Sequence, residues 1–369
     1  MTVNHPGVYR TAIVGTGGIA ATHARSVQDS GGRARLVAAV DVDLDRVRTF
    51  AETWRIPRIY PSLDALLEAE EVDLISVCTP PAQHGPLALA CLNAGVTVLV
   101  EKPPTVSLAE LRELGEAQRR STAHVATVFQ HRFGPGAARL RRIAAAGDLG
   151  RPLLATCETL WYRDDAYFAV PWRGSWENEG GGPTMGHGIH QFDLLLSILG
   201  PWQEITAVAG RQARQIDTED VSMALVTFAN GALASVVNSV VSPRQTSKLR
   251  VDYDHATVEV EHLYGYTDHD WIITPAPGHE ALAGRWDTAH TDTPSSHADQ
   301  LTAVLDALDQ GVPPPVTLED AWQTMEFTAA LYASAFTGQR IERGQITPES
   351  PFERRMNGTG APWQKASVR

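Results

Sequence analysis

The first candidate site is a short glycine-rich segment near the N-terminus that could hold a phosphate group. The stretch from Thr11 to Ala20 reads T-A-I-V-G-T-G-G-I-A, an apolar run that ends in glycines and continues into a helix-compatible segment. Such a strand, turn and helix start can cradle a pyrophosphate, because the N–H groups and the dipole at the helix N-terminus favour an anion. Gly15 permits the sharp turn, Gly17 lets the backbone approach the phosphate, and the small Ala20 lets the helix pack closely on the strand. The predicted contacts with the phosphates are Gly15, Thr16, Gly17, Gly18, Ile19 and Ala20.

A carboxylate after the second apolar run indicates which dinucleotide this turn prefers. Asp41 ends the run L-V-A-A-V-D. It can accept hydrogen bonds from both ribose hydroxyls of NAD, whereas it would repel the extra phosphate of NADP. Arg46 and Arg48 lie close by in the sequence and could still meet a phosphate. NADP therefore stays open as the alternative cofactor, although Asp41 favours NAD. The alternative is a plain glycine turn, but the strand context and the position of Asp41 favour a dinucleotide site.

A lysine follows another apolar run and is a candidate for proton chemistry. The segment V-L-V-E-K-P-P places Lys102 directly past the end of a predicted buried parallel strand. Ligands of doubly wound sheets bind beyond these carboxyl ends, so we expect Lys102 to point at the nicotinamide end of the cofactor. Partial burial lowers the pKa of a lysine, which makes it a workable proton carrier or a donor to a substrate hydroxyl. The alternative is a surface lysine in a turn.

Two histidines further along the chain form a second candidate centre. His187 and His190 are three residues apart, as neighbours on one face of a helix would be. The spacing of these two histidines and Asp193 would allow the imidazoles to share a metal ion. No third strong ligand is identifiable nearby, so we expect no metal. Asp193 also has a structural alternative, which is to hold His190 in place or to cap a loop.

Aromatic and arginine side chains are dense just before the glycine run that precedes these histidines. Aromatic faces pack against the C–H faces of sugar rings while arginines and aspartates bond the hydroxyls, so this segment is typical of carbohydrate recognition. The alternative is that Trp172 and Trp176 are core or interface residues. The predicted substrate contacts of this segment are Arg163, Tyr167, Trp172, Arg173 and Trp176.

The elements that must position these residues follow two patterns. Up to about residue 130, apolar runs alternate with helical patterns, which predicts parallel strands joined by right-handed crossovers. Strand-like runs with few helices follow, and Asn230-Gly231 between two of them is a hairpin signal, which predicts an antiparallel sheet. The predicted fold is α/β plus α+β, with an N-terminal Rossmann dinucleotide-binding domain (1–130), a C-terminal α/β domain with a large, mostly antiparallel open sheet (131–348) and a C-terminal tail (349–369) that packs loosely or wraps a neighbour. Helices are predicted at 44–54, 85–94, 189–199, 296–308 and 318–335.

Composition narrows the class of protein. The 369 residues are 43% hydrophobic and 20% charged, which is typical of an ordinary two-domain globular protein. A net charge of −12 argues against nucleic acid or an anionic membrane as a partner. Cys78, Cys91 and Cys157 have no metal-like spacing, and no apolar run reaches membrane-spanning length, so we expect a cytoplasmic protein with reduced thiols. An open sheet with few helices leaves one face to be covered, which predicts a homodimer or homotetramer.

Several of these segments together resemble the glucose-fructose oxidoreductase / inositol dehydrogenase (Gfo/Idh/MocA) family. They are G-T-G-G-I-A with Asp41, T-P-P-A-Q-H (79–84), A-C-L-N-A-G-V-T-V-L-V-E-K-P (90–103), Q-H-R-F (130–133) and G-G-G-P-T-M-G-H-G-I-H-Q-F-D-L-L (180–195). The resemblance spans about residues 10 to 345. It implies a catalytic Lys102, a sugar- or cyclitol-binding His190, a cis peptide before Pro103 and a C-terminal sheet used for oligomerisation. It also implies cofactor contacts at Arg46, Thr79, Pro80, His84, Glu101, Lys102 and Gln130, and substrate contacts at Lys102, Arg132, His187, His190 and Asp193.

One position departs from the family pattern. The family commonly has an aspartate four residues before the histidine, and this chain has Gly186 there, followed by His187. The missing carboxylate would orient the substrate hydroxyl or tune Lys102, and His187 is the candidate replacement. We favour His190 as the acid and base that exchanges the hydroxyl proton, with Lys102 polarising the same oxygen, and the reversed assignment is the alternative.

The predicted activity is NAD-dependent oxidation of a secondary hydroxyl of a sugar, glycoside or cyclitol, or reduction of the matching ketone. One alternative is a tightly bound NAD that is used in transient oxidation for epimerisation, elimination or glycoside cleavage. Another alternative is a non-catalytic regulator that senses NAD or a sugar. Gly186 favours the regulator, and the retained Lys102 and His190 argue against it.

Overall fold

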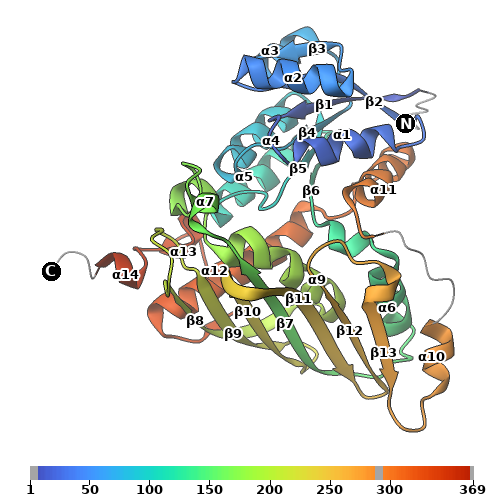
Figure 1. Cartoon of the computed structure of the whole chain (residues 1–369), viewed down its shortest axis with the longest axis vertical. Coiled ribbons are helices and arrows are strands. Elements are labelled where there is room, and N and C mark those ends of the chain that lie inside the picture. Colours follow the sequence, from blue (N-terminus) through green and yellow to red (C-terminus); the bar gives the residue numbers. More distant parts are fainter. Residues whose placement is uncertain (1–6, 287–293, 366–369) are drawn as a thin grey trace. The chain divides into compact units, whose positions relative to one another are not determined.

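The computed structural model describes residues 7–286 and 294–365, and the chain divides into two compact units (Figure 1). The first unit contains the chain up to Thr105, Ala109–Val128 and His297–Trp322. The second unit contains Val106–Leu108, Phe129–Ser296 and the chain from Gln323 onward.

The first unit is built on a six-stranded parallel sheet with the order β3-β2-β1-β4-β5-β6. Its central strands are mostly apolar and buried, which is typical of a parallel sheet with helices on both faces. The predicted Rossmann domain is therefore confirmed. The strands are β1 (Tyr9–Val14), β2 (Ala34–Val40), β3 (Arg58–Tyr60), β4 (Leu74–Val77), β5 (Thr97–Val100) and β6 (Val125–Thr127). The helices are α1 (Ala20–Gln28), α2 (Leu44–Trp54), α3 (Leu63–Ala69), α4 (His84–Asn93), α5 (Leu108–Gln118) and α11 (His297–Gln310), with a short 3₁₀ turn η1 (Pro81–Gln83).

Polar side chains set where several helices begin. The Asp43 carboxylate accepts hydrogen bonds from two backbone N–H groups in the first turn of α2, and the Ser62 hydroxyl accepts one at the start of α3. At α12 (Leu318–Thr337), the backbone N–H of Asp320 donates to the Thr317 hydroxyl and that of Thr317 donates to the Asp320 carboxylate. These reciprocal bonds form a capping box, which fixes where the helix begins.

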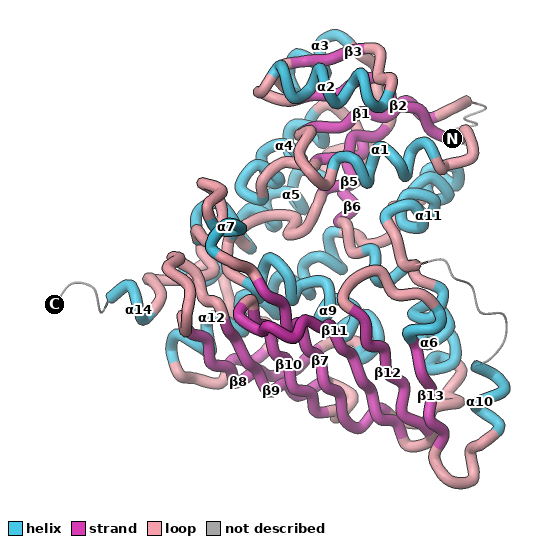
Figure 2. The backbone as a smooth tube through the Cα atoms, viewed as in Figure 1, coloured by secondary structure: helices cyan, strands magenta, loops and turns pink. Residues whose placement is uncertain are grey.

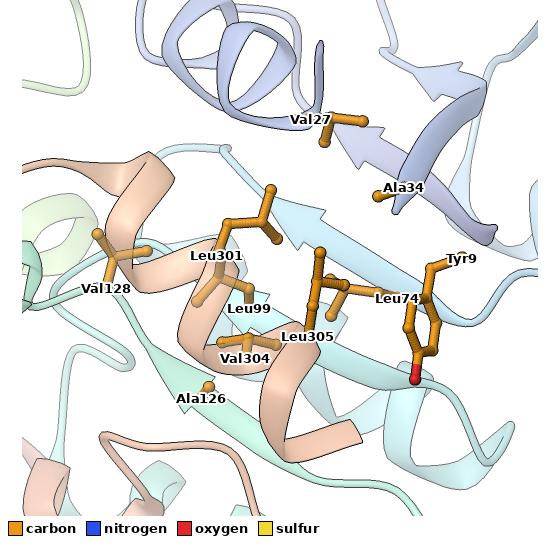
Figure 3. Close-up of a cluster of buried hydrophobic side chains, with 10 residues drawn as sticks. All are labelled: Tyr9, Val27, Ala34, Leu74, Leu99, Ala126, Val128, Leu301, Val304 and Leu305. Carbon is orange, nitrogen blue, oxygen red and sulfur yellow. The ribbon is translucent and has the colours of Figure 1, made fainter. Parts of the chain in front are cut away.

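One helix of the first unit comes from a distant part of the chain. Figure 3 shows Leu301, Val304 and Leu305 of α11 packed with buried side chains of the parallel strands. At its far end, the Tyr9 hydroxyl donates to Asp309 at 2.7 Å. The predicted division into 1–130 and 131–348 differs from the structure here, because a pattern read along the chain cannot show that a later helix returns to an earlier sheet.

The second unit is built on an eight-stranded sheet with the order β13-β12-β11-β7-β10-β9-β8-β14, and Figure 2 shows its long strands side by side. Every neighbouring pair is antiparallel except β7 with β10. This confirms the predicted large, mostly antiparallel sheet. The strands are β7 (Pro152–Tyr162), β8 (Trp202–Gly210), β9 (Val221–Phe228), β10 (Leu233–Ser239), β11 (Val241–Tyr253), β12 (Ala256–His262), β13 (Trp271–Pro275) and β14 (Ile341–Glu342). The remaining helices are α6 (Pro135–Ala145), α7 (Asp165–Phe168), α8 (Trp176–Glu179), α9 (Ile189–Leu199), α10 (Ala281–Trp286), α13 (Pro351–Arg354) and α14 (Pro362–Lys365), with turns η2 (Gln130–Phe133), η3 (Thr184–Gly188) and η4 (Asp268–Asp270).

The C-terminal segment is more tightly packed than its composition suggests. Phe352, Met356 and Ala361 are buried, and the Trp363 indole donates to the backbone oxygen of Asp217 at 2.9 Å. The expectation of loose packing for 349–369 is therefore wrong up to this point, and residues 366–369 lie outside the described range. Isolated apolar residues among turn formers are a weak signal, because no periodicity announces their burial. Within the described ranges, no helix has both the length and the apolar character needed to cross a membrane.

Candidate active site

The glycine turn of the first unit has the geometry that a phosphate requires. Gly15 adopts φ of +87°, and a Cβ there would lie 2.9 Å from the backbone of Cys78, so only glycine fits. Gly17 and Gly18 are exposed, and apart from their chain neighbours no atom of the described residues lies within 4 Å of where a Cβ would be. Among the described residues no side chain caps the start of α1, so no side chain competes with an anion at the helix N-terminus. The turn thus fits the pyrophosphate of a dinucleotide.

Asp41 lies beside this turn with an ionised side chain. Both the backbone N–H and the hydroxyl of Thr16 donate to its Oδ2 at 2.8 Å, and the Asp43 N–H donates to its Oδ1 at 3.0 Å. Arg46 donates to both carboxylate oxygens, at 3.1 and 2.7 Å. Burial alone would raise the pKa of Asp41, but the hydrogen bonds from Arg46, Asp43 and Thr16 outweigh it and lower this pKa to about 2.

The two arginines that could meet a phosphate are engaged with carboxylates. Arg46 forms a salt bridge with Asp41, and Arg48 donates a hydrogen bond to the exposed Asp45 at 2.7 Å. Arg46 is half-exposed, so a shift of its side chain would free the Asp41 carboxylate for ribose hydroxyls. The contact of Arg46 with a cofactor stays a prediction.

A buried carboxylate at the end of β5 organises the turn that carries Lys102. Oε1 of Glu101 lies 2.8 Å from Nε2 of His23 and 3.0 Å from Nε2 of His297. Oε2 accepts the backbone N–H of Lys102 at 3.2 Å. Burial would raise the pKa of Glu101, but the two histidines hold it well below its usual range, while burial lowers the pKa of His23. Neither histidine was singled out from the sequence, because their contacts with Glu101 are long-range.

The same three side chains are the one group in residues 7–286 and 294–365 whose ligand atoms could share a metal ion, all lying within 4.8 Å of one another. Hydrogen bonds of ordinary length account for these contacts. The possible metal site at His187, His190 and Asp193 is not supported, since those residues form no such group in the described chain.

His84 connects the two loops on either side of the lysine. Its Nδ1 lies 2.6 Å from the backbone oxygen of Pro103, and its Nε2 lies 2.7 Å from that of Thr79. The ring is buried, which lowers its pKa, and Lys102 itself is half-buried. The Lys102–Pro103 peptide bond is cis, as the resemblance implied. The observed contacts of His84 are structural, and cofactor contacts of His84, Thr79 and Pro80 stay predictions.

In the second unit, His187 lies on the π-helical turn η3 and His190 on α9, which continues it. Such turns within helices are frequent at functional sites. Within residues 7–286 and 294–365, no atom outside the turn of Gly186 lies within 4 Å of where its Cβ would be, so no side chain of these residues fills the place of the missing aspartate.

A buried glutamate that the sequence did not reveal holds the start of η3. The Glu219 carboxylate accepts the backbone N–H groups of Gly182 and Thr184 at 3.1 and 3.2 Å and the Tyr332 hydroxyl at 2.8 Å. Burial raises the pKa of Glu219 to about 7, against the lowering effect of these bonds. A Cβ on Gly182 would collide with the backbone oxygen of Glu219, and the glycine run was the only sequence signal of this close approach.

The aromatic and arginine segment gathers around His187. Nε2 of His187 lies 3.3 Å from Nε of Arg163 and 3.4 Å from the Tyr167 hydroxyl. The Trp161 ring meets the His187 ring edge-on at 4.9 Å. By contrast, the Trp176 ring packs on Tyr332 at 5.1 Å, which agrees with its core alternative.

His190 lies in a separate ring cluster of the same unit. Its ring stacks on His131 at 5.3 Å and meets Tyr264 edge-on at 5.5 Å. Gln130 is buried and donates to the Tyr264 hydroxyl. Tyr264 was not foreseen, because it lies in a loop without a recognisable motif. The predicted cofactor contact of Gln130 stays a prediction.

Arg132 and Asp193 form a closed ion pair. Arg132 donates to both oxygens of Asp193 at 2.8 and 2.7 Å, and the Thr324 hydroxyl adds a bond at 2.8 Å. Asp193 is fully buried. The structural alternative for Asp193 therefore accounts for its observed contacts, and substrate contacts of either residue stay predictions.

Comparisons with known proteins agree with this architecture. Residues 9–129 match a family model described as an oxidoreductase family with an NAD-binding Rossmann fold, and residues 137–282 match the GFO/IDH/MocA C-terminal domain. The chain is similar to D-glucoside 3-dehydrogenase of Escherichia coli, with 27% identity over 90% of this chain and 97% of that protein. It is also similar to D-apiose dehydrogenase of Paraburkholderia graminis, with 25% identity over 93% of this chain and 92% of the relative.

A solved structure shares the fold over nearly the whole chain. The WlbA dehydrogenase of Bordetella pertussis, solved in complex with NADH and UDP-GlcNAcA, superposes with a TM-score of 0.81 at 24% identity. The match covers 91% of this chain and 98% of that one. Both units therefore occur together, in this order, in a known structure.

The raised pKa of Glu219 predicts a pH-dependent stability. The folded state holds this proton more tightly than the unfolded chain does, so the contribution to the free energy of unfolding is present below pH 4.5 and is lost as the pH rises through about 7. It amounts to about 3 kcal/mol. In urea unfolding from pH 4.5 to 8, we expect wild type to lose stability relative to Glu219→Gln. For the exposed-site control Glu177→Gln, the free energy of unfolding should follow the same pH dependence as in wild type. The prediction would be contradicted if Glu219→Gln also followed the wild-type pH dependence.

Proposed function

The chain belongs to the Gfo/Idh/MocA family of oxidoreductases, and we propose that it is an NAD-dependent dehydrogenase acting on a secondary hydroxyl of a sugar, glycoside or cyclitol, or on the matching ketone. The observation that carries the proposal lies in the first unit. The turn that bears Lys102 is fixed at the carboxyl end of β5, in the same parallel sheet as the glycine turn and Asp41. Ligands of such sheets bind beyond these strand ends. The names of the relatives, D-glucoside 3-dehydrogenase and D-apiose dehydrogenase, support the substrate class.

Two side chains of this chain are proposed to handle the proton. When bound, the nicotinamide ring of NAD supplies the acceptor for the hydride that leaves the carbinol carbon. His190 takes the proton of the hydroxyl, and the Lys102 ammonium donates a hydrogen bond to the same oxygen as it becomes a carbonyl. His187 is proposed to orient the substrate, and the reversed roles of Lys102 and His190 are the alternative assignment.

The other two functions considered from the sequence are less well supported. Transient oxidation by a tightly bound NAD and sugar sensing without catalysis both remain compatible with a Rossmann unit. The relatives that cover nearly the whole chain are named dehydrogenases. Net formation of reduced cofactor is therefore the expected outcome.

We also propose that the chain forms a homodimer or homotetramer through the open face of its eight-stranded sheet. Strands β8, β9 and β10 expose apolar side chains on that face, with Leu225 at 68%, Val208 at 64% and Leu233 at 55% exposure. Neighbouring strands β11 and β12 carry charged side chains in mutual contact, such as Lys248 with Glu259 at 3.3 Å. A mixed apolar and charged face of this kind suits a self-complementary interface.

A cytoplasmic location is proposed as well. The three cysteines, Cys78, Cys91 and Cys157, are all buried free thiols. Burial raises the pKa of each of them, which keeps the thiols protonated and unreactive. Reduced cysteines of this kind fit a reducing compartment.

Removal of the lysine tests the proposed activity. With NAD and a panel of monosaccharides, glycosides and inositols, we expect Lys102→Ala to lower kcat by on the order of 10²- to 10⁴-fold, because the developing charge loses its donor. The affinity for NADH, measured by titration calorimetry, should be unchanged. The variant Lys102→Met keeps most of the side-chain volume and serves as the control for packing. Equal losses of NADH affinity and turnover would show that the lysine is structural.

Replacement of Asp41 tests the basis of cofactor choice. In Asp41→Ser the carboxylate that repels a 2′-phosphate is gone and Arg46 loses its partner. We expect the ratio of kcat/KM for NADP over NAD to rise by on the order of 10²-fold. In the double variant Asp41→Ser/Arg46→Ala, much of that gain should disappear. An unchanged ratio in Asp41→Ser would contradict this role of Asp41.

Charges on the open sheet face test the oligomer. We expect Leu225→Glu combined with Val208→Glu to yield monomers in analytical ultracentrifugation, since desolvating two carboxylates in an interface is unfavourable. Val312→Glu, at a half-exposed position of the first unit, is the matched control and should leave the assembly intact. Wild-type protein that sediments as a monomer at micromolar concentration would overturn the proposal.

A further inference from the structure

Two arginines of the second unit lie against the same aromatic ring. The guanidinium carbon of Arg173 is 3.7 Å from the centroid of Tyr167, and that of Arg163 is 5.2 Å from it. Each arginine also contacts a tryptophan. The guanidinium carbon of Arg173 lies 4.5 Å from the ring centroid of Trp172, and that of Arg163 lies 4.7 Å from the ring centroid of Trp161. Aromatic faces on two sides restrict how each guanidinium can turn. The two cations are therefore held close to each other in a fixed arrangement.

Neither guanidinium has a carboxylate partner in the described parts of the chain. Arg163 donates to the backbone oxygen of Tyr162 at 2.9 Å and contacts Nε2 of His187 at 3.3 Å. The guanidinium of Arg173 donates no hydrogen bond to any described residue, and its Nε is buried without a partner. A buried N–H that finds no acceptor destabilises the folded state.

Other arginines of this unit show what a satisfied guanidinium looks like. Arg132 is paired with Asp193 at 2.7 Å, Arg139 with Asp268 at 3.1 Å and Arg214 with Asp165 at 3.1 Å. Arg163 and Arg173 are half-buried and yet lack such pairs within the described chain. Their arrangement is therefore not the general pattern of this unit.

The electrostatic environment of the pair is unfavourable as it stands. Burial lowers the pKa of Arg163, and Asp164 compensates only in part. Burial also lowers the pKa of Arg173, whose partial compensation by Glu179 is opposed by repulsion from Arg163. Two half-buried like charges that nearby carboxylates compensate only in part are stabilised when an anion binds between them.

We propose that Arg163 and Arg173 bind an anionic oxygen group of the substrate, so that the enzyme acts on acidic sugars, such as uronic acids or sugar phosphates, in preference to neutral ones. A guanidinium presents its N–H groups in a planar fork that matches a carboxylate or a phosphoryl group. The Tyr167 hydroxyl, 3.4 Å from Nε2 of His187, connects the pair to the histidine segment. The inference rests on the proposed function, since it names the substrate class of that site.

The experiment measures binding separately from turnover. Protein loaded with NADH is titrated calorimetrically with methyl β-D-glucuronide, with glucose 6-phosphate and with the neutral methyl β-D-glucoside. We expect at least one acidic sugar to bind about 10- to 100-fold more tightly than the neutral one. In Arg163→Met and in Arg173→Met this difference should shrink to near zero, because the affinity for the acidic sugar falls much more than the affinity for the neutral one. Preference for the glucuronide identifies a carboxylate group, and preference for the phosphate identifies a phosphoryl group.

Control variants separate recognition from folding. Arg214→Met removes a paired arginine of the same unit and should keep the preference for acidic sugars. Arg173→Lys keeps the positive charge without the planar guanidinium group and should retain part of the preference for acidic sugars. Because an unpaired, half-buried charge is removed, Tm of Arg173→Met should not fall below that of wild type. Equal affinity of wild type for acidic and neutral sugars, or equal losses for both in the methionine variants, would overturn the inference. Reduction of NAD by neutral sugars would in that case still uphold the proposed dehydrogenase.

Discussion

The geometry of the first unit depends on one buried negative charge. A carboxylate removed from water is strongly destabilising unless hydrogen-bond donors surround it. Glu101 meets this condition with His23 of α1, His297 of α11 and the backbone N–H of Lys102. The helix that follows the phosphate turn, the helix that returns from the second half of the chain and the end of β5 are therefore held by one group. Any displacement of one of them would leave part of this charge uncompensated.

This arrangement also restricts the protonation of the two histidines. Each Nε2 faces a carboxylate oxygen and so carries a proton that it donates to Glu101. Burial lowers the pKa of His23, in agreement with a neutral ring there. His84 adds a third buried imidazole, which lies against the backbone oxygens of Thr79 and Pro103. The loops after β4 and β5 are thus fixed by imidazoles that do not themselves need to take part in chemistry.

Sequence patterns predicted what is local and missed what is distant. The helix at 44–54 was predicted at its observed bounds, because periodicity and an N-cap are properties of neighbouring residues. Strand β11 carries a weaker sequence signal, since its residues alternate between a buried face and an open polar face and include a proline. The contacts of Glu101 with His23 and His297 span 78 and 196 positions of the chain, and no spacing rule reaches that far. Glu219 was missed for the same reason, although the glycine run facing it was visible.

In the second unit, charged residues with a structural role differ from those proposed to bind substrate in how their charge is compensated. Asp193 and Arg132 neutralise each other, and Glu219 is held by hydrogen bonds while burial raises its pKa to about 7. Arg163 and Arg173 follow neither pattern. Stacking on an aromatic ring contributes roughly 0.5–2 kcal/mol, but it supplies no counter-charge for a half-buried guanidinium. The rings around Tyr167 can therefore position these cations but cannot neutralise them, and sites that leave such a conflict unresolved within the fold are the ones where ligands bind.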